Sequence, residues 1–261
     1  MHLALVRDPA SGRESLALKK PLYQEQWQND LAASAANTVL GVIEHEATLE
    51  RVVDLARRMM ASTSRLVSGL LARAPEGSVA CKAGCDHCCY QIVGVTPPEA
   101  FAILEHLKQT RSLDELEQLK AHVATLYERA RDLPSAQRFS PEHPCAFLRD
   151  GSCSIYEARP LACRGVNSLD ASDCETRLRD PDARAQFLEQ GHGGRCYLEP
   201  LRAFRAVSAG LQLGLSELYR LDMRGLDLLG AMHLLLQSDA SLASAWIGGQ
   251  QPFQRVVRDG Q

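Results

Sequence analysis

The sequence lacks both the long apolar segments of membrane proteins and the excess of one charge that attracts nucleic acid. Its 29 basic and 32 acidic residues leave a net charge of −3, which provides no general attraction to nucleic acid or acidic lipid. The longest apolar stretch, LDLLGAMHLLL, is interrupted by Asp227 and is too short to span a bilayer. We therefore expect neither nucleic acid nor a membrane among the partners of this chain.

Signals for secretion and for nucleotide binding are also missing. The opening residues, MHLALVRDPASGRESLALKK, contain no charged segment followed by an apolar one, so we expect a cytoplasmic protein. The glycine-rich GHGGR at 191–195 lacks the spacing and the preceding strand of a phosphate-binding loop. The sequence therefore contains neither a phosphate loop nor a dinucleotide-binding fingerprint.

Cysteine, by contrast, is abundant, with nine residues in a chain of 261. A disulfide framework is a poor explanation, because the cytoplasm keeps thiols reduced and an odd number cannot pair completely within one chain. A chain of this length can also bury a hydrophobic core without covalent staples. Metal binding or thiol catalysis explains the cysteines better.

The scaffold around the cysteines is predicted to be helical. Between Leu31 and Leu71 the apolar residues recur in steps of three and four, which predicts one long amphipathic helix or two helices broken near Gly41. The apolar stripe over 42–70 is either an internal core face or a dimer seam. The sequence leaves these two alternatives open.

Capping signals place further helices along the chain. Boxes headed by Thr96 and Ser112 predict helices over 97–109 and 113–132, and Asp180 followed by a proline begins another helix. Towards the C-terminus we expect two or three further helices, roughly over 199–213, 215–222 and 224–237. The tail beyond these helices is weakly patterned.

Residues 133–175 differ from the helical segments, because they are rich in Pro, Ser and Cys. Within them CAFLRDGSCSIY predicts a small hairpin, since Asp-Gly favours the turn that matches strand twist. The fold class is therefore mainly α, a helical bundle carrying a Cys-rich irregular insert with a small β-hairpin. We expect one continuous domain of three parts: an N-terminal helical segment (1–75), a cysteine-cluster metal-binding region with two inserted helices (76–198), and C-terminal helices with a tail (199–261).

Seven of the cysteines fall into two boxes. The boxes are Cys81-x3-Cys85-x2-Cys88-Cys89 and Cys145-x7-Cys153-x9-Cys163, with Cys174 and Cys196 beyond them. Thiolates are soft ligands that suit zinc, Cu(I) or iron–sulfur clusters. Positions 81, 85 and 88 would share one face of a helix, and Gly84 makes a tight loop equally possible. Either geometry supplies three ligands, and the second box is the expected donor of the fourth.

The strongest ligand candidates are the cysteines at fixed spacing within the two boxes. They are Cys81, Cys85, Cys88, Cys145, Cys153 and Cys163, followed by Cys89 and Cys174. Because neighbouring side chains point in different directions, Cys89 is expected to reach a second metal, bridge two metals or remain a buried thiol. Four ligands per closed zinc site allow at most two all-thiolate sites.

Other polar residues near the boxes have open roles. Arg159 and Arg164 flank Cys163 and are expected to donate hydrogen bonds to sulfur, the alternative for Arg159 being an ion pair with a carboxylate. The histidines close to cysteines are either ligands or surface groups; they are His87, His143 and His192. Cys196 is expected to pack as a small hydrophobic residue.

The segments CKAGCDHCC, over 81–89, and PCAFLRDGSCSIYEARPLACR, over 144–164, resemble the YkgJ-like cysteine-cluster family, the CxxCxxCC zinc- or iron-chelating domain. The continuation GVNSLDASDCE, which adds Cys174, resembles a longer bacterial branch of that family. The resemblance implies metal chelation without naming the metal. Relatives attached to flagellin lysine methylation imply that an iron–sulfur cluster and S-adenosylmethionine chemistry are alternatives. The first gap here is three residues instead of two.

Three functional hypotheses follow. The first is a cytoplasmic metal-binding protein that holds zinc or iron, with a 4Fe-4S cluster as one form of the cofactor, and acts through a protein partner. The second is an iron–sulfur-dependent enzyme transferring a methyl group from S-adenosylmethionine to a protein. The third is a metal storage or delivery protein. The spacing of 81, 85 and 88 also matches radical S-adenosylmethionine enzymes, but the chain lacks the strand–helix units of their barrels.

Overall fold

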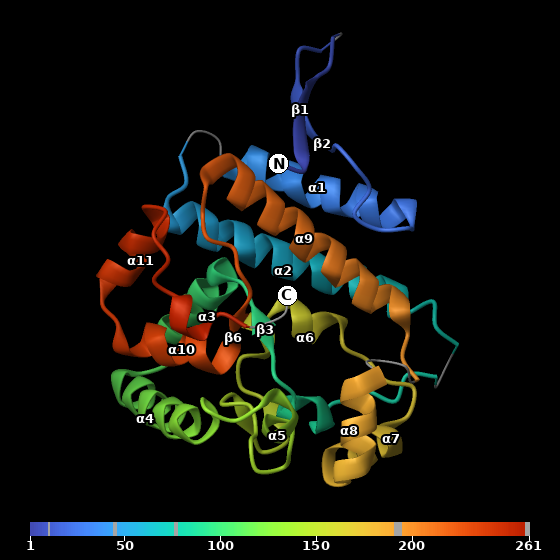
Figure 1. Ribbon diagram of the computed structural model, residues 1–261, viewed down its shortest axis with the longest axis vertical. Helices are drawn as coiled ribbons and strands as arrows, with labels where there is room; N and C mark the ends of the chain where they lie inside the picture. The colour runs from blue at the N-terminus through green and yellow to red at the C-terminus, as the bar shows by residue number, and fades with distance from the viewer. Residues whose placement is uncertain (10, 44–45, 76–77, 191–194, 259–261) are drawn as a thin grey trace.

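The computed structural model describes residues 1–9, 11–43, 46–75, 78–190 and 195–258, and in these residues the chain is mainly helical, as the sequence predicts (Figure 1). The helices are α1 (Gln26–Ile43), α2 (Leu49–Leu71), α3 (Pro97–Thr110), α4 (Leu113–Ala130), α5 (Ser135–Arg138), α6 (Leu161–Gly165), α7 (Ala171–Arg179), α8 (Pro181–Gln190), α9 (Leu198–Tyr219), α10 (Leu228–Gln237) and α11 (Ala240–Ile247). Among the described residues, none of these helices is long and apolar enough to cross a membrane.

Three short strand pairs accompany the helices. They are β1 (Leu3–Arg7) with β2 (Glu14–Leu18), β3 (Gly94–Val95) with β6 (Leu226–Asp227), and β4 (Leu148–Arg149) with β5 (Ser152–Cys153), all antiparallel. The β4–β5 pair is the expected Asp-Gly hairpin, and its two turn residues, Asp150 and Gly151, have φ of 48° and 72°. Positive φ at both central positions is the turn geometry that Asp-Gly favours.

Helices α1 and α9 pack with unusually close backbones, and α9 crosses both α1 and α2 in Figure 1. A Cβ atom at Gly210 would lie 2.1 Å from the carbonyl oxygen of Ala32, and one at Gly214 would lie 2.7 Å from Cγ2 of Val39. The expected break near Gly214 is therefore wrong. The two glycines sit inside one continuous helix because they allow it to approach α1.

The end of α9 and the start of α10 also differ from expectation. Helix α9 ends at Tyr219, where Arg220 adopts a left-handed conformation with φ of 57°. The expected helix over 224–237 begins only at Leu228, because the two preceding residues form β6 and pair with β3. Asp227 then caps α10 by accepting a hydrogen bond from the Gly230 amide at 3.1 Å.

Helices α1 and α2 are separate, as one of the two alternatives expected, and α1 ends at Ile43, two residues beyond Gly41. Thr48 begins α2 by accepting a hydrogen bond from the Arg51 amide at 3.3 Å. The apolar stripe of α2 is buried in the main core of the chain, so within the described residues it is an internal core face. The buried members are Val52, Val53, Leu55, Ala56, Met59, Met60, Thr63 and Val67.

The two capping boxes form as predicted and start α3 and α4. Asp180 likewise caps α8, accepting hydrogen bonds from the amides of Asp182 and Ala183 at 2.8 and 3.1 Å. These helix starts depend only on residues within one turn, which is why the sequence locates them to within a residue or two.

The two ends of the chain contain structure that the sequence did not reveal. The tail forms α11, which places Trp246 in the core with its ring centroid 5.4 Å from that of Phe101. At the other end, β1 and β2 form a projecting hairpin (Figure 1), anchored by Leu3 and Leu16 against Ala36 of α1. The main core contains side chains from Ala35 through to Val256, so all three expected parts of the chain contribute to it.

Candidate metal centre

The first cysteine box is a loop followed by a 3-10 turn, η1 (His87–Tyr90), and not a regular helix. Gly84 has φ of 82°, a conformation in which a side chain would be strained. The amide of Cys85 donates to the carbonyl of Lys82 at 3.1 Å, and the amide of Cys89 donates to that of Asp86 at 2.7 Å. Of the two alternatives for this box, the tight loop is the one that forms.

The second box is tied to the first through the backbone. The Cys145 amide donates to the Cys89 carbonyl at 2.7 Å, so the two boxes meet directly. The β4–β5 hairpin then carries Cys153, and α6 carries Cys163. Cys145 and Cys153 pack against the main core, which holds their backbone positions relative to the helices.

The buried carboxylate of Glu99 connects α3 to α6. One of its oxygens accepts hydrogen bonds from the amide and hydroxyl of Thr96 at 2.9 and 2.6 Å. Its other oxygen accepts from the Leu161 amide at 2.7 Å. Because Leu161 begins the short helix that carries Cys163, this hydrogen bond helps to fix the position of Cys163 relative to α3.

Four thiols interact electrostatically at this meeting point, and we call them the inner thiol group. They are Cys88, Cys145, Cys153 and Cys163. Burial raises the pKa of Cys163 well above its usual range, and the neighbouring thiols Cys145, Cys88 and Cys153 raise it further. Burial likewise raises the pKa of Cys145 to about 11, against a hydrogen bond from the Phe147 amide that lowers it.

These shifts have a common physical meaning. Thiolates at these four positions would repel one another, and burial disfavours the charged form, so each thiol keeps its proton unless a cation offsets the charge. A divalent metal ion provides that charge and releases the protons as it binds. The inner group is therefore chemically suited to a thiophilic metal.

Cys89 lies against this group. A hydrogen bond between its side chain and that of Cys88 is the main cause that raises the pKa of Cys88, ahead of burial. The two adjacent sulfurs thus lie near each other despite their different directions along the turn. This position is compatible with each of the roles expected for Cys89.

A second set of thiols lies beside the first, and we call it the outer thiol group. It consists of Cys81 and Cys85 of the first box with Cys174 of α7. Ser168 lies beside two of them, because its amide donates to the Cys81 sulfur at 3.2 Å, and its hydroxyl, which donates to the Asp170 carbonyl at 2.9 Å, lowers the pKa of Cys174. Burial is the main cause that raises the pKa of both Cys81 and Cys174.

The two arginines near Cys163 have different surroundings. Arg164 is buried and donates to the carbonyls of Arg159 and Glu157 at 2.8 Å each, and to the Ser64 hydroxyl. Arg159 stacks on the Tyr156 ring at 4.1 Å and acts electrostatically on three inner thiols. Its Nε is buried and has no hydrogen-bond partner in the described part of the chain, so it is a donor available to sulfur.

The remaining sequence candidates lie at the edge of the site or outside it. His87 is 4.0 Å from the Asp86 carboxylate, and Cys196 has Arg177 as its charged neighbour. His192 lies outside the described residues. His143 lines a cavity together with Cys145.

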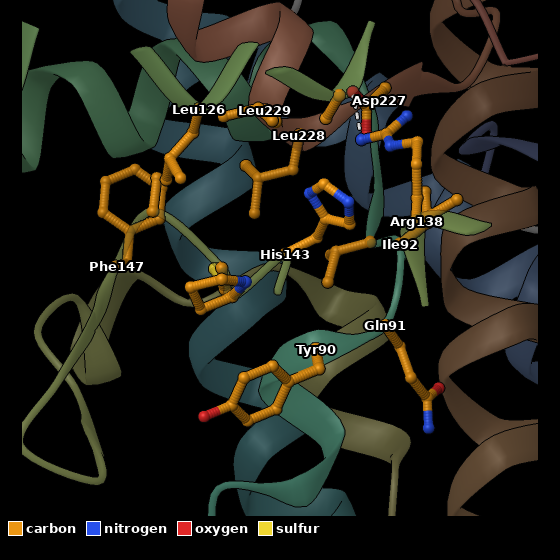
Figure 2. Close-up of a pocket in the computed structure, with 15 residues that line it drawn as sticks. Tyr90, Gln91, Ile92, Leu126, Arg138, His143, Phe147, Asp227, Leu228 and Leu229 are labelled. Carbon is orange, nitrogen blue, oxygen red and sulfur yellow. Dashed lines mark hydrogen bonds and ion pairs between the residues drawn. The ribbon is translucent and has the colours of Figure 1, made fainter. Parts of the chain in front are cut away.

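That cavity has a volume of about 40 Å³, enough for a water molecule or two. Figure 2 shows His143 beside Leu228 and Ile92, with the ion pair of Arg138 and Asp227 at the edge, 3.0 Å apart. The sequence did not suggest this ion pair, because its two members are far apart along the chain and carry no motif. Both Cys145 and residues of α10 line this cavity, so α10 lies next to the inner thiol group.

The thiols fit a metal by their chemistry, but their side chains do not yet form a coordination shell. Within the described ranges, no three His, Cys, Asp or Glu side chains converge closely enough to hold a metal ion. All nine cysteines are free. Metal binding would therefore require the cysteine side chains to turn towards a common point.

Comparison with known proteins identifies the same region. Residues 80–184 match the family model described as "CxxCxxCC: Putative zinc- or iron-chelating domain". No curated protein and no solved structure matches the chain. The matched region contains every cysteine except Cys196, together with α3 to α7, and leaves out the layer of α1, α2 and α9. Residues 80–184 are therefore similar to the CxxCxxCC zinc- or iron-chelating domain, and they are set within a larger helical fold.

Proposed function

We propose that this chain holds zinc or iron through the inner thiol group, and that this metal joins the irregular insert to the helical scaffold. The observation that supports the proposal is the meeting of Cys88 with Cys145, Cys153 and Cys163 across two distant boxes. Four thiolates complete the tetrahedral shell of a structural zinc site, and the same number anchors an iron–sulfur cluster.

Each of the four thiols is held in place by a different local structure. Cys88 belongs to the 3-10 turn, and Cys145 is held by its backbone bond to Cys89. Cys153 belongs to the hairpin, and Cys163 to the helix that Glu99 positions. Arg159 would donate its unpaired Nε–H to a thiolate, which lowers the charge at the centre.

The proposed role is structural in the first instance. The segments that carry these thiols are short, so few backbone hydrogen bonds hold each of them. Cross-linking them through one ion converts metal-binding free energy into folding free energy for the insert. A stabilised insert then presents a fixed surface to a protein partner in the cytoplasm.

Metal analysis of the chain, purified without oxygen, tests this proposal. We expect bound zinc in a colourless protein, or bound iron with acid-labile sulfide in a brown one. The Cys163→Ser variant should lose this metal, and Cys196→Ser, which removes a thiol outside the inner group, should keep it. A folded wild-type chain that takes up neither metal would contradict the proposal.

Methyl transfer from S-adenosylmethionine receives no specific support from the cavity next to the centre. A cofactor of that size requires a pocket of several hundred Å³. The space beside Cys145 has a volume of about 40 Å³, and a second, open hollow of about 550 Å³ is lined by His143, Glu142 and Arg184 but by none of the cysteines. The storage or delivery hypothesis has one observation in its favour. The outer thiol group supplies potential metal ligands that a structural centre at the inner thiol group would not use.

A further inference from the structure

The open hollow of about 550 Å³ lies between two parts of the chain. One wall comes from residues 133–143, which include α5, and the other comes from the end of α7 and the first turns of α8. Helix α8 contacts both α5 and α7, and in Figure 1 the three lie at the end of the molecule opposite the β1–β2 hairpin. A hollow of this volume is within the usual range of small-molecule sites.

The two walls are joined by contacts in which no cysteine takes part. The ring of Phe139 lies against that of Phe187 in α8, with their centroids 5.9 Å apart. Arg184 of α8 donates from Nη1 to the Phe139 carbonyl at 2.7 Å. Its guanidinium group is therefore held in place at the hollow by the fold itself.

Two polar groups of the lining residues lack partners. Ser140 is only 8% exposed, and its hydroxyl has no hydrogen-bond partner within the described ranges of the chain. The Nε of Arg184 is also buried and unpaired among those same residues. Buried donors without an acceptor are costly, and native structures satisfy nearly all of them. A single group rich in acceptor oxygens, placed in the hollow, would satisfy both.

The charge of the lining favours an anion. Arg179 and Arg184 both line the hollow, and among the described residues Glu142 is the only carboxylate that does so. Arg179 pairs with Glu175 at 2.9 Å, but the two side chains are 67% and 50% exposed, and such exposed pairs contribute little. Guanidinium groups bind phosphate and carboxylate through two parallel hydrogen bonds. Two arginines against one glutamate leave one net positive charge for such a group.

We propose that this hollow binds the phosphate or carboxylate group of a small polar molecule, held by Arg184, Arg179 and the hydroxyl of Ser140. Gln137 and Glu142 also line the hollow, so they can hydrogen-bond to the other polar groups of the same molecule. None of these residues is a cysteine. The inference therefore does not depend on the proposed metal site.

The hollow nevertheless lies close to the second cysteine box. His143 lines both the hollow and the small cavity that Cys145 also lines. The His143 amide donates to the Ser140 carbonyl at 3.1 Å, which closes the turn between these two lining residues. A molecule bound in the hollow would thus be a neighbour of the inner thiol group without contacting its sulfurs.

Titration of the reduced full-length chain with inorganic phosphate, followed by isothermal titration calorimetry at constant ionic strength in chloride, tests the inference. We expect one saturable site per chain with a Kd on the order of 1 mM or tighter. A parallel titration with acetate separates the two sources of the oxyanion. Saturable binding of phosphate alone identifies a phosphate ester as the ligand class, binding of acetate alone identifies a carboxylate, and binding of both supports a site that accepts either.

Arginine variants then locate the bound anion. Arg184→Gln and Arg179→Gln should each weaken binding of the anion by about tenfold or more, since each removes charge-assisted hydrogen bonds. Arg149→Gln is the control, because it removes the same charge from the exposed β4–β5 hairpin, outside the hollow, and it should change the Kd less than about twofold.

Ser140→Ala separates a binding role from a structural one. Because the hydroxyl is unpaired in the described residues, its removal should not lower the Tm measured without the anion. The same variant should bind the anion about three- to tenfold more weakly, since one neutral hydrogen bond is lost. This variant also keeps the inference testable if Arg184→Gln does not fold.

Three results would overturn the inference. The first is a folded chain that binds neither phosphate nor acetate saturably. The second is an Arg149→Gln variant that loses as much affinity as Arg179→Gln, which would mean general attraction by surface charge. The third is a Ser140→Ala variant that binds the anion as tightly as the wild type. Metal content of the same preparations reports separately on the proposed function, so either proposal can fail without the other.

Discussion

The hydrogen bond from the Leu161 amide of α6 to Glu99 allows a direct test of how the helical scaffold supports the cysteines. In Glu99→Gln the side chain keeps its shape but offers one carbonyl oxygen in place of two carboxylate oxygens. One oxygen of Glu99 now accepts two hydrogen bonds from Thr96, and the other accepts one from the Leu161 amide. If the amide carbonyl keeps the bonds to Thr96, its NH₂ group must face the N–H of Leu161.

The magnitude follows from what is left unpaired. A buried backbone donor without a partner costs about 1–3 kcal/mol, and hydrogen bonds to a charged group are stronger than neutral ones. We therefore expect Glu99→Gln to lower the free energy of unfolding by about 2–3 kcal/mol. In a chain of this length that is a fall of roughly 4–12 °C in Tm.

The second capping box of the same chain provides the control. Glu115 accepts both of its bonds, from the amide and hydroxyl of Ser112, on one oxygen and is exposed, so Glu115→Gln should cost less than about 0.5 kcal/mol. Thermal unfolding followed by circular dichroism, with and without a metal chelator, compares the two variants. Equal Tm values for Glu99→Gln and Glu115→Gln would show that the buried tie does not support α6 as described.

Three further predictions concern packing, pH and the charge at the centre. Gly210→Ala places a Cβ 2.1 Å from a backbone oxygen of α1 and should lower the free energy of unfolding by about 1–3 kcal/mol. Gly41→Ala has open space around it and should raise the free energy of unfolding by about 0.5–1 kcal/mol. Urea unfolding of the two variants and the wild type measures both changes. Burial raises the pKa of Cys145 from an ordinary 9.0 to about 11 in the folded chain, so between pH 9.0 and 11 the unfolded state binds fewer protons than the folded state. The free energy of unfolding of the metal-free chain should therefore fall as pH rises through this range. An unfolding midpoint that stays constant between pH 9.0 and 11 would contradict this prediction. Arg159→Met should weaken metal retention against a chelator roughly 10–100-fold, while Arg149→Met in the exposed hairpin should leave it unchanged.

Local signals predicted those parts of the fold whose energy comes from residues within one turn. The capping boxes at Thr96 and Ser112, the cap at Asp180 and the hairpin turn at Asp150 all form at the expected positions. Each depends on hydrogen bonds between neighbours in the sequence or on a backbone conformation that one residue favours. Such preferences act in the same way whatever the rest of the chain does.

Expectations failed where a distant partner decides the structure. Gly214 looked like a helix end, but its lack of a side chain serves contact with Val39. The tail looked weakly patterned, yet Trp246 packs against Phe101 in the core. A periodicity argument considers only the residues of one segment, so it cannot identify a surface that a second segment covers.

The same division holds for the cysteines. Their number, their crowding into two boxes and the softness of thiolate ligands were enough to indicate a metal and to select the region that the family model matches. Which thiols meet was decided only by the tertiary structure, which brings Cys88 to the second box and Cys81 to Cys174. Spacing constrains residues within about one turn of each other, whereas the bonds from Glu99 to Leu161 and from Cys145 to Cys89 join segments that are brought together by burial of a common core.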